Sequence, residues 1–80
     1  MSRDPRCQFG LRLSEMRKSR GWSQERLAEK SGLARSYVGG VERGQRNIAL
    51  LNICKLADAL ELPPSVLLAL SSVEASNKAA

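Results

Sequence analysis

Positively charged side chains gather in the first half of this chain, where they favour chemistry with an anion. The 80 residues hold 13 Lys and Arg against 8 Asp and Glu, a formal net charge of +5. Residues 1–47 contain 11 of the bases and 5 of the acids, whereas residues 48–80 contain 2 and 3. This asymmetry predicts a face that binds a polyanion, although a solvated charged surface would give the same pattern.

Residues that usually bind metals or carry out catalysis are scarce. The chain has no His, and Cys7 and Cys54 are its only cysteines. Because both His and a CxxC pair are absent, the sequence predicts no metal site, no cofactor and no enzymatic activity. A small-molecule ligand is not expected either, since a chain this short has little room for a pocket. Cys54 falls on an apolar helical pattern and is expected in the core, and Cys7 has little support as a redox residue. We also expect a cytoplasmic protein without a membrane partner, because no N-terminal apolar run resembles a signal peptide or a membrane span.

Glycine and proline divide the chain into five predicted helices. Segments rich in Leu, Ala, Glu, Arg and Lys are interrupted at Gly21, Gly32, Gly44 and the Pro63–Pro64 pair, and strand-forming residues are too few for a sheet. The helices are expected at residues 7–20, 23–31, 34–43, 49–60 and 64–70. The sequence thus predicts a compact, all-α, five-helix domain over residues 7–70, between a disordered tail at 1–6 and a flexible tail at 71–80.

The second and third predicted helices are both short, and a turn that contains Gly32 joins them. Gly32 can adopt the positive φ of a sharp turn, and Ala28 is small enough for the third helix to cross over it. Val38 and Val41 form the buried anchor of the third helix. This is the layout of a helix-turn-helix, whose second helix lies in the DNA major groove.

The stretch SQERLAEKSGLARSYVGGVERGQRN, residues 23–47, resembles the helix-turn-helix of the lambda-repressor-like, or XRE, transcriptional regulators. The resemblance extends from about residue 9 to residue 70 and includes the segment KLADALEL. Within this family, RSYVGGVERGQRN is most similar to the controller proteins of restriction–modification systems. The resemblance implies an all-helical homodimer that binds a two-fold-symmetric DNA operator and regulates transcription.

The same resemblance assigns roles to individual residues. Arg35 and Ser36 match positions that face base edges, where an arginine can donate two hydrogen bonds to guanine. The residues that match DNA-backbone contacts are Gln24, Tyr37, Arg43, Arg46 and Asn47. To these we add Ser23, the predicted cap of the second helix, and Arg17 from the basic surface of the first. Each of these predicted DNA contacts could instead be an ordinary surface residue. Glu42, in contrast, is expected to pair with a nearby Arg.

Two adjacent glycines, Gly39 and Gly40, lie in the middle of the third predicted helix. Glycine in a helix interior costs about 1 kcal/mol relative to alanine, so their presence needs a reason. In the phage repressors that this chain resembles, a long side chain at the position of Gly40 reads a base. We therefore interpret the glycines as a removal of bulk that lets the helix backbone approach DNA closely.

Residues 48–80 contain more leucines than one small core can hide. The fourth helix has a wide apolar stripe that includes Leu50, but leucines also occur on its other sides and on those of the fifth helix. A homodimer interface would cover this excess, and Leu51, Val66 and Leu70 are its predicted residues. The sequence leaves two alternatives open: a monomer, and a helical protein-interaction module or antitoxin-like partner with the same fold.

Overall fold

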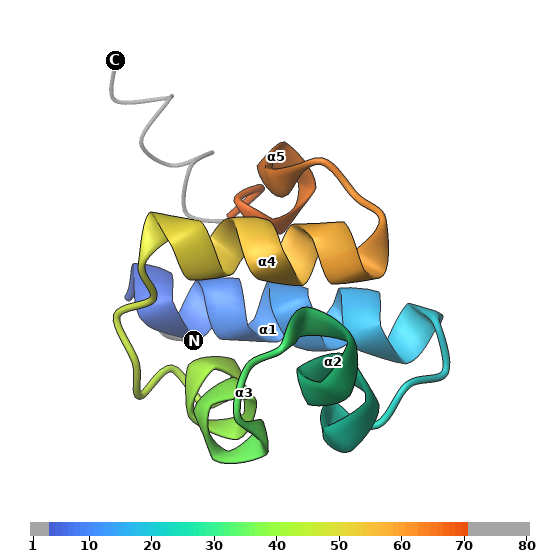
Figure 1. Cartoon of the computed structure of the whole chain (residues 1–80). Coiled ribbons are helices and arrows are strands. Elements are labelled where there is room, and N and C mark those ends of the chain that lie inside the picture. The colour runs from blue at the N-terminus through green and yellow to red at the C-terminus, as the bar shows by residue number, and fades with distance from the viewer. Residues whose placement is uncertain (1–3, 71–80) are drawn as a thin grey trace.

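Five helices make up the part of the chain that the computed structural model describes, residues 4–70, and this part contains no strand. They are α1 (Pro5–Ser19), α2 (Gln24–Ser31), α3 (Arg35–Glu42), α4 (Leu50–Leu60) and α5 (Pro64–Leu67). The prediction of an all-α, five-helix domain is therefore confirmed. Figure 1 shows α2 and α3 on one side of α1 and α4, with α5 on the other side. Within residues 4–70, the helices are too short or too polar to cross a membrane.

The first helix begins two residues earlier than the expected start at residue 7. Asp4 caps α1, because its carboxylate accepts a hydrogen bond from the backbone N–H of Arg6 at 2.9 Å. Pro5 occupies the first helical position, where the missing N–H costs no hydrogen bond. The Arg6 side chain also donates to Asp4 and lowers the pKa of that carboxyl group. The expected tail at 1–6 was thus too long, whereas residues 1–3 and the expected tail at 71–80 lie outside the described residues.

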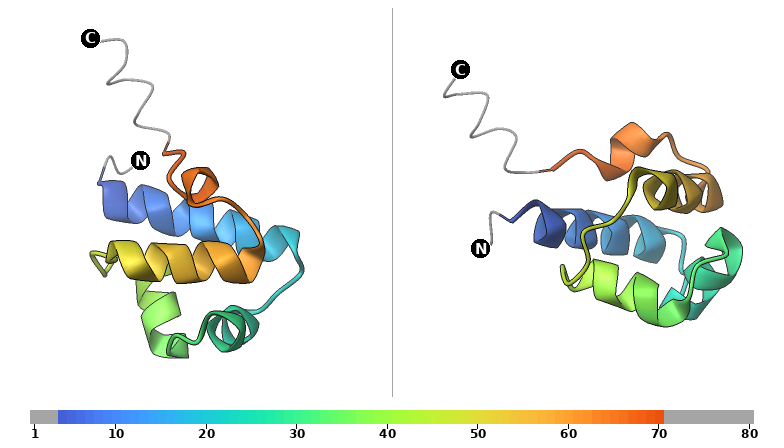
Figure 2. Two further views of the ribbon diagram at one scale, coloured as in Figure 1. Left: turned by 45° about the horizontal axis from the view of Figure 1, so that its top comes forward. Right: turned by 60° about the vertical axis from the view of Figure 1, so that its left-hand side comes forward.

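Every helix contributes to one hydrophobic core. The largest side chains that are completely buried are Leu13, Leu27, Val38, Val41, Leu56, Leu60 and Leu67. α1 packs against α3 and α5, α2 packs against α3 and α4, and α4 packs against α5. Both views in Figure 2 again place α2 and α3 on the side of the molecule away from α5. The molecule therefore has a helix-turn-helix side and an α5 side.

The structure shows which part of the apolar stripe of α4 is buried, and it corrects the expected place of Cys54. Leu50, the first residue of α4 and of its apolar stripe, is 70% exposed. Cys54 is half-buried, not fully enclosed. Ile53, Leu56 and Leu60 form the buried side of α4 instead.

The backbones of α1 and α3 approach closely at Gly10. A Cβ at this position would lie 2.5 Å from the carbonyl oxygens of both Val41 and Glu42. Real Cβ atoms essentially never come so close to backbone atoms, so glycine is required for this contact. Gly10 therefore fixes how deeply the C-terminal end of α3 sits against α1.

Candidate nucleic-acid interface

A turn of three residues, 32–34, joins α2 to α3. Gly32 has a φ of 77°, in the left-handed region that favours glycine. The backbone N–H groups of Gly32 and Leu33 donate to the carbonyl oxygen of Ala28 at 2.9 and 3.2 Å. These bonds end α2 and allow α3 to begin at Arg35. The two helices and their turn therefore have the helix-turn-helix layout that the sequence predicts.

The third helix has a buried side and an exposed side. Val38 and Val41 are buried in the core, where they anchor α3 as expected. Arg35 and Ser36 occupy the first turn of α3 and are exposed. The first residues of a recognition helix are those that reach base edges in the major groove. The position and exposure of Arg35 and Ser36 are thus compatible with their predicted role as base contacts.

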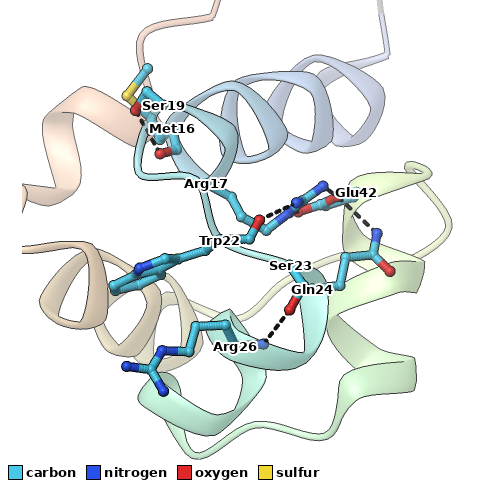
Figure 3. Close-up of polar contacts among 8 residues, drawn as sticks. All are labelled: Met16, Arg17, Ser19, Trp22, Ser23, Gln24, Arg26 and Glu42. Atoms are coloured by element: carbon cyan, nitrogen blue, oxygen red, sulfur yellow. Dashed lines mark hydrogen bonds and ion pairs between the residues drawn. The ribbon is translucent and has the colours of Figure 1, made fainter.

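A hydrogen-bonded network centred on Glu42 connects α1, α2 and α3 (Figure 3). The guanidinium of Arg17 donates to both carboxylate oxygens of Glu42, at 2.7 and 3.0 Å. Gln24, the first residue of α2, donates from Nε2 to the same carboxylate at 2.9 Å. The third guanidinium nitrogen of Arg17 donates to the carbonyl oxygen of Trp22 at 2.6 Å. The network therefore attaches the end of α3 to both other helices.

Arg17 is part of this internal network, and its assignment to the DNA backbone is withdrawn. Its side chain is only 11% exposed, and that of Glu42 is 6% exposed. All three guanidinium nitrogens donate to protein oxygens, which hold the nearly buried group inside the protein rather than on a surface that meets a phosphate. The hydrogen bond to Glu42 also raises the pKa of Arg17. The expectation that Glu42 pairs with a nearby Arg is confirmed, with Arg17 as its partner.

Tyr37 and Arg46 contact each other on the surface of α3. The guanidinium carbon of Arg46 lies 5.5 Å from the centre of the Tyr37 ring, in a cation–π arrangement. The Tyr37 hydroxyl accepts a hydrogen bond from Nδ2 of Asn52, on α4, at 3.1 Å. Sequence reasoning missed Asn52, because nothing in the sequence connects α4 to a residue 15 positions earlier. The two predicted backbone contacts Tyr37 and Arg46 thus lie together, and Asn52 on α4 holds Tyr37 in place.

Gly39 and Gly40 are covered by side chains of this protein, so the interpretation that they leave the helix backbone open to DNA was wrong. Both glycines are buried. A Cβ at Gly39 would lie 3.1 Å from Nη1 of Arg43 and 3.4 Å from Oε1 of Gln24. A Cβ at Gly40 would lie 3.2 Å from Cγ of Arg46. The two glycines thus leave space for Arg43, Gln24 and Arg46, which are predicted contacts to the DNA backbone.

The remaining predicted backbone contacts lie at the two ends of the motif. Ser23 is exposed and caps α2, because its hydroxyl accepts a hydrogen bond from the N–H of Arg26 at 3.0 Å. Arg43 directly follows α3, is exposed, and donates from Nε to Gln45 at 3.2 Å. Asn47 is also exposed, in the segment between α3 and α4. These three positions are accessible to a phosphate backbone and remain predictions.

Apolar side chains are accessible at the start of α4, on α5 and directly after α5, and together they are called the apolar surface of α4 and α5. Leu51 is 67% exposed, and Val66 and Leu70 are half-buried. Leu50 and Leu68 are exposed as well, and sequence reasoning did not select them for an interface. A pocket of about 120 Å³ adjoins this surface, lined by Pro5, Arg6, Phe9, Asn47, Ile48, Ile53, Leu68 and Leu70. Exposed leucines beside an apolar pocket are typical of an interface between protein chains.

Comparison with known proteins relates this geometry to a family. The helix-turn-helix family model matches residues 13–67. A hypothetical transcription factor of Neisseria meningitidis serogroup B is 49% identical over 57 residues, which are 71% of this chain and 54% of that protein. The chain therefore spans about half the length of that relative.

Two solved structures of restriction–modification controller proteins have the same architecture. The controller protein C.AhdI from Aeromonas hydrophila is 61% identical, with a TM-score of 0.77 over 78% of this chain and 94% of that one. The controller protein C.Esp1396I, solved as a tetramer in complex with its natural 35-base-pair operator, is 30% identical. It has a TM-score of 0.75 over 84% of this chain and 87% of that one. The chain belongs to the helix-turn-helix family of XRE-like regulators, together with these controller proteins.

Proposed function

We propose that this chain is a sequence-specific DNA-binding transcriptional regulator, not an enzyme, and that it acts in the cytoplasm as a restriction–modification controller protein. The observation that carries the proposal is the start of α3, where Arg35 and Ser36 are exposed while Val38 and Val41 anchor the helix. The similar controller protein C.Esp1396I was solved with its operator, which supports DNA as the partner.

The proposed regulator binds a two-fold-symmetric operator as a homodimer. Two copies related by a two-fold axis place their α3 helices about 34 Å apart, one turn of B-DNA. The apolar surface of α4 and α5, which includes Leu51, Val66 and Leu70, supplies the interface between the copies. Because Arg35 and Ser36 lie on α3, this interface leaves them free for DNA.

The proposal is tested by measuring DNA binding with fluorescence anisotropy. Two duplexes are compared: one selected from a random pool by the wild-type protein, and one of scrambled sequence with the same composition. We expect binding to both at low salt, tighter binding to the selected duplex, and a steep loss of affinity as salt rises, because bound Lys and Arg release counterions. Absence of binding to any duplex at low salt would overturn the proposal and favour the protein-interaction module.

Arg35 and Arg43 provide a matched pair for the assignment of roles. Arg35→Ala should weaken binding to the selected duplex by about 1–3 kcal/mol and leave binding to the scrambled duplex nearly unchanged, because a base contact carries the discrimination. Arg43→Ala removes the same charge, yet it should weaken both complexes alike, because a phosphate contact is independent of sequence. Equal losses from Arg35→Ala on the two duplexes would contradict its role as a base contact.

A further inference from the structure

The side chain of Arg46 lies along the surface of α3 at the position of Gly40. A Cβ at Gly40 would lie 3.2 Å from Cγ, 3.3 Å from Nε and 3.8 Å from Cδ of Arg46. Three atoms along one side chain are thus within van der Waals range of a single missing methyl group. The aliphatic part of Arg46 occupies the space that any other residue at position 40 would fill.

Tyr37 forms the second contact surface for Arg46. Tyr37 and Gly40 are three residues apart on α3, so they lie on the same side of the helix. The Arg46 guanidinium lies over the Tyr37 ring, and Asn52 holds the ring through its hydroxyl. The segment that carries Arg46 is also attached to α3, because the backbone N–H of Gln45 donates to the carbonyl oxygen of Gly40 at 2.9 Å. Arg46 is therefore placed before any DNA binds, although its residue is exposed.

We propose that Gly40 is a positioning residue for DNA binding, whose missing side chain allows Arg46 to rest on α3 and the Tyr37 ring and so to reach the DNA backbone from a preset position. A side chain that is already in place loses less rotamer freedom when it binds, and this increases affinity. The proposal rests on the proposed function, since it concerns the same DNA-binding surface. It also gives a reason for a glycine in the middle of a helix.

The placement of Arg46 is tested without DNA by nuclear magnetic resonance. The Tyr37 ring should shift the side-chain proton resonances of Arg46 upfield in the wild-type protein, and Tyr37→Leu should abolish this ring-current shift. Gly40→Ala should alter this shift, because the new methyl group would lie 3.2 Å from Cγ of Arg46 and force that side chain to move along α3. Gly39→Ala is the matched control: its methyl group meets Arg43 and Gln24, so the shift should persist. An identical shift in the wild-type protein and in Gly40→Ala would overturn the proposal.

The consequence for binding is tested with a double-mutant cycle on the duplex selected by the wild-type protein. Arg46→Ala should weaken binding and reduce the slope of affinity against salt by about one. Gly40→Ala should weaken binding less, because it moves the Arg46 side chain without removing its charge. In the Arg46→Ala background, Gly40→Ala should cause no further loss of affinity, because Arg46 is the side chain that it displaces. Equal losses from Gly40→Ala with and without Arg46 would overturn the proposal.

Thermal unfolding distinguishes an effect of Gly40→Ala on the position of Arg46 from an effect on the stability of the fold. Alanine favours a helix more than glycine does, so Gly40→Ala in the Arg46→Ala background should raise the midpoint of thermal unfolding. A lower midpoint in that background would show that position 40 serves the fold and would overturn the proposal. If the wild-type protein binds no DNA, the proposed function fails, whereas the ring-current shifts still report whether Gly40 positions Arg46.

Discussion

At the scale of single residues, Glu42 is the side chain on which three helices converge. Its carboxylate accepts hydrogen bonds from Arg17 on α1 and from Gln24 on α2, and it belongs to the last turn of α3. Both members of the ion pair are nearly buried. A buried pair is weak evidence for net stability, but removal of one member leaves the other charge without a partner in a medium of low dielectric constant.

Glu42→Ala should therefore destabilise the protein by about 3–5 kcal/mol, because the guanidinium of Arg17 stays buried without its carboxylate. The free energy of unfolding is measured by urea denaturation followed by circular dichroism. Glu29→Ala is the matched control, since Glu29 pairs with Arg26 one turn away on the exposed surface of α2. Its loss should cost less than about 0.5 kcal/mol. Equal costs for the two substitutions would contradict a structural role for the Glu42 network.

The sequence shows which charged side chains are available, but it does not predict which of them pair with each other. Glu42 was expected to pair with an arginine because a carboxylate on a DNA-binding surface is repelled by phosphates. The identity of that arginine could not be predicted, because Arg17 lies 25 residues earlier and only the packing of α1 against α3 brings it close. Arg17 was assigned to DNA because charge alone does not distinguish an internal pair from an exposed contact.

At the scale of elements, the position of α3 depends on its close crossing with α1. Apolar spacing predicted both helices and the anchor residues Val38 and Val41, because burial on one side leaves a periodic pattern. The close crossing of α1 and α3 was not predicted from the sequence. A glycine inside a helix, such as Gly10, only weakly signals a close contact, since it does not say which backbone comes near.

Gly10→Ala should destabilise the protein by about 1–3 kcal/mol, because the new methyl group overlaps the backbone oxygens of Val41 and Glu42 and forces α3 away from α1. The sign of the change in stability is informative, since a Gly→Ala substitution in an open helix stabilises a protein by up to about 1 kcal/mol. Gly39→Ala is the control, because its methyl group approaches only the ends of two flexible side chains. Thermal unfolding of both variants checks this, and an unchanged or higher midpoint for Gly10→Ala would show that the crossing can relax.

At the scale of the whole molecule, the helices separate two surfaces. α2 and α3 lie on the side away from α5, so the helix-turn-helix and α5 face different surroundings (Figures 1 and 2). The unequal charge of the two halves of the sequence predicted this separation. The sequence could not show which leucines remain exposed, because leucines occur on several sides of α4 and only the packed structure assigns each one. Leu50 and Leu68 were therefore missed.

Leu51→Asp should shift the protein from dimer to monomer without unfolding it. Leu51 is 67% exposed in the isolated chain, so a carboxylate there costs the monomer little, whereas two copies would bury two charges in an apolar interface. Because burial of a leucine side chain contributes about 1.5–3 kcal/mol, we expect the dimer dissociation constant to rise at least about tenfold. Sedimentation equilibrium measures this constant, and circular dichroism checks that the helices persist.

The same substitution at Leu11, an exposed leucine on α1, is the matched control and should leave the dissociation constant unchanged. A monomer can contact only one half of a two-fold-symmetric operator, so Leu51→Asp should also weaken binding to the complete site while one half-site still binds. If Leu11→Asp dissociates the dimer and Leu51→Asp does not, the interface lies on α1 rather than on α4 and α5. If neither substitution dissociates the dimer, Leu51 is not part of the interface and its predicted role is contradicted.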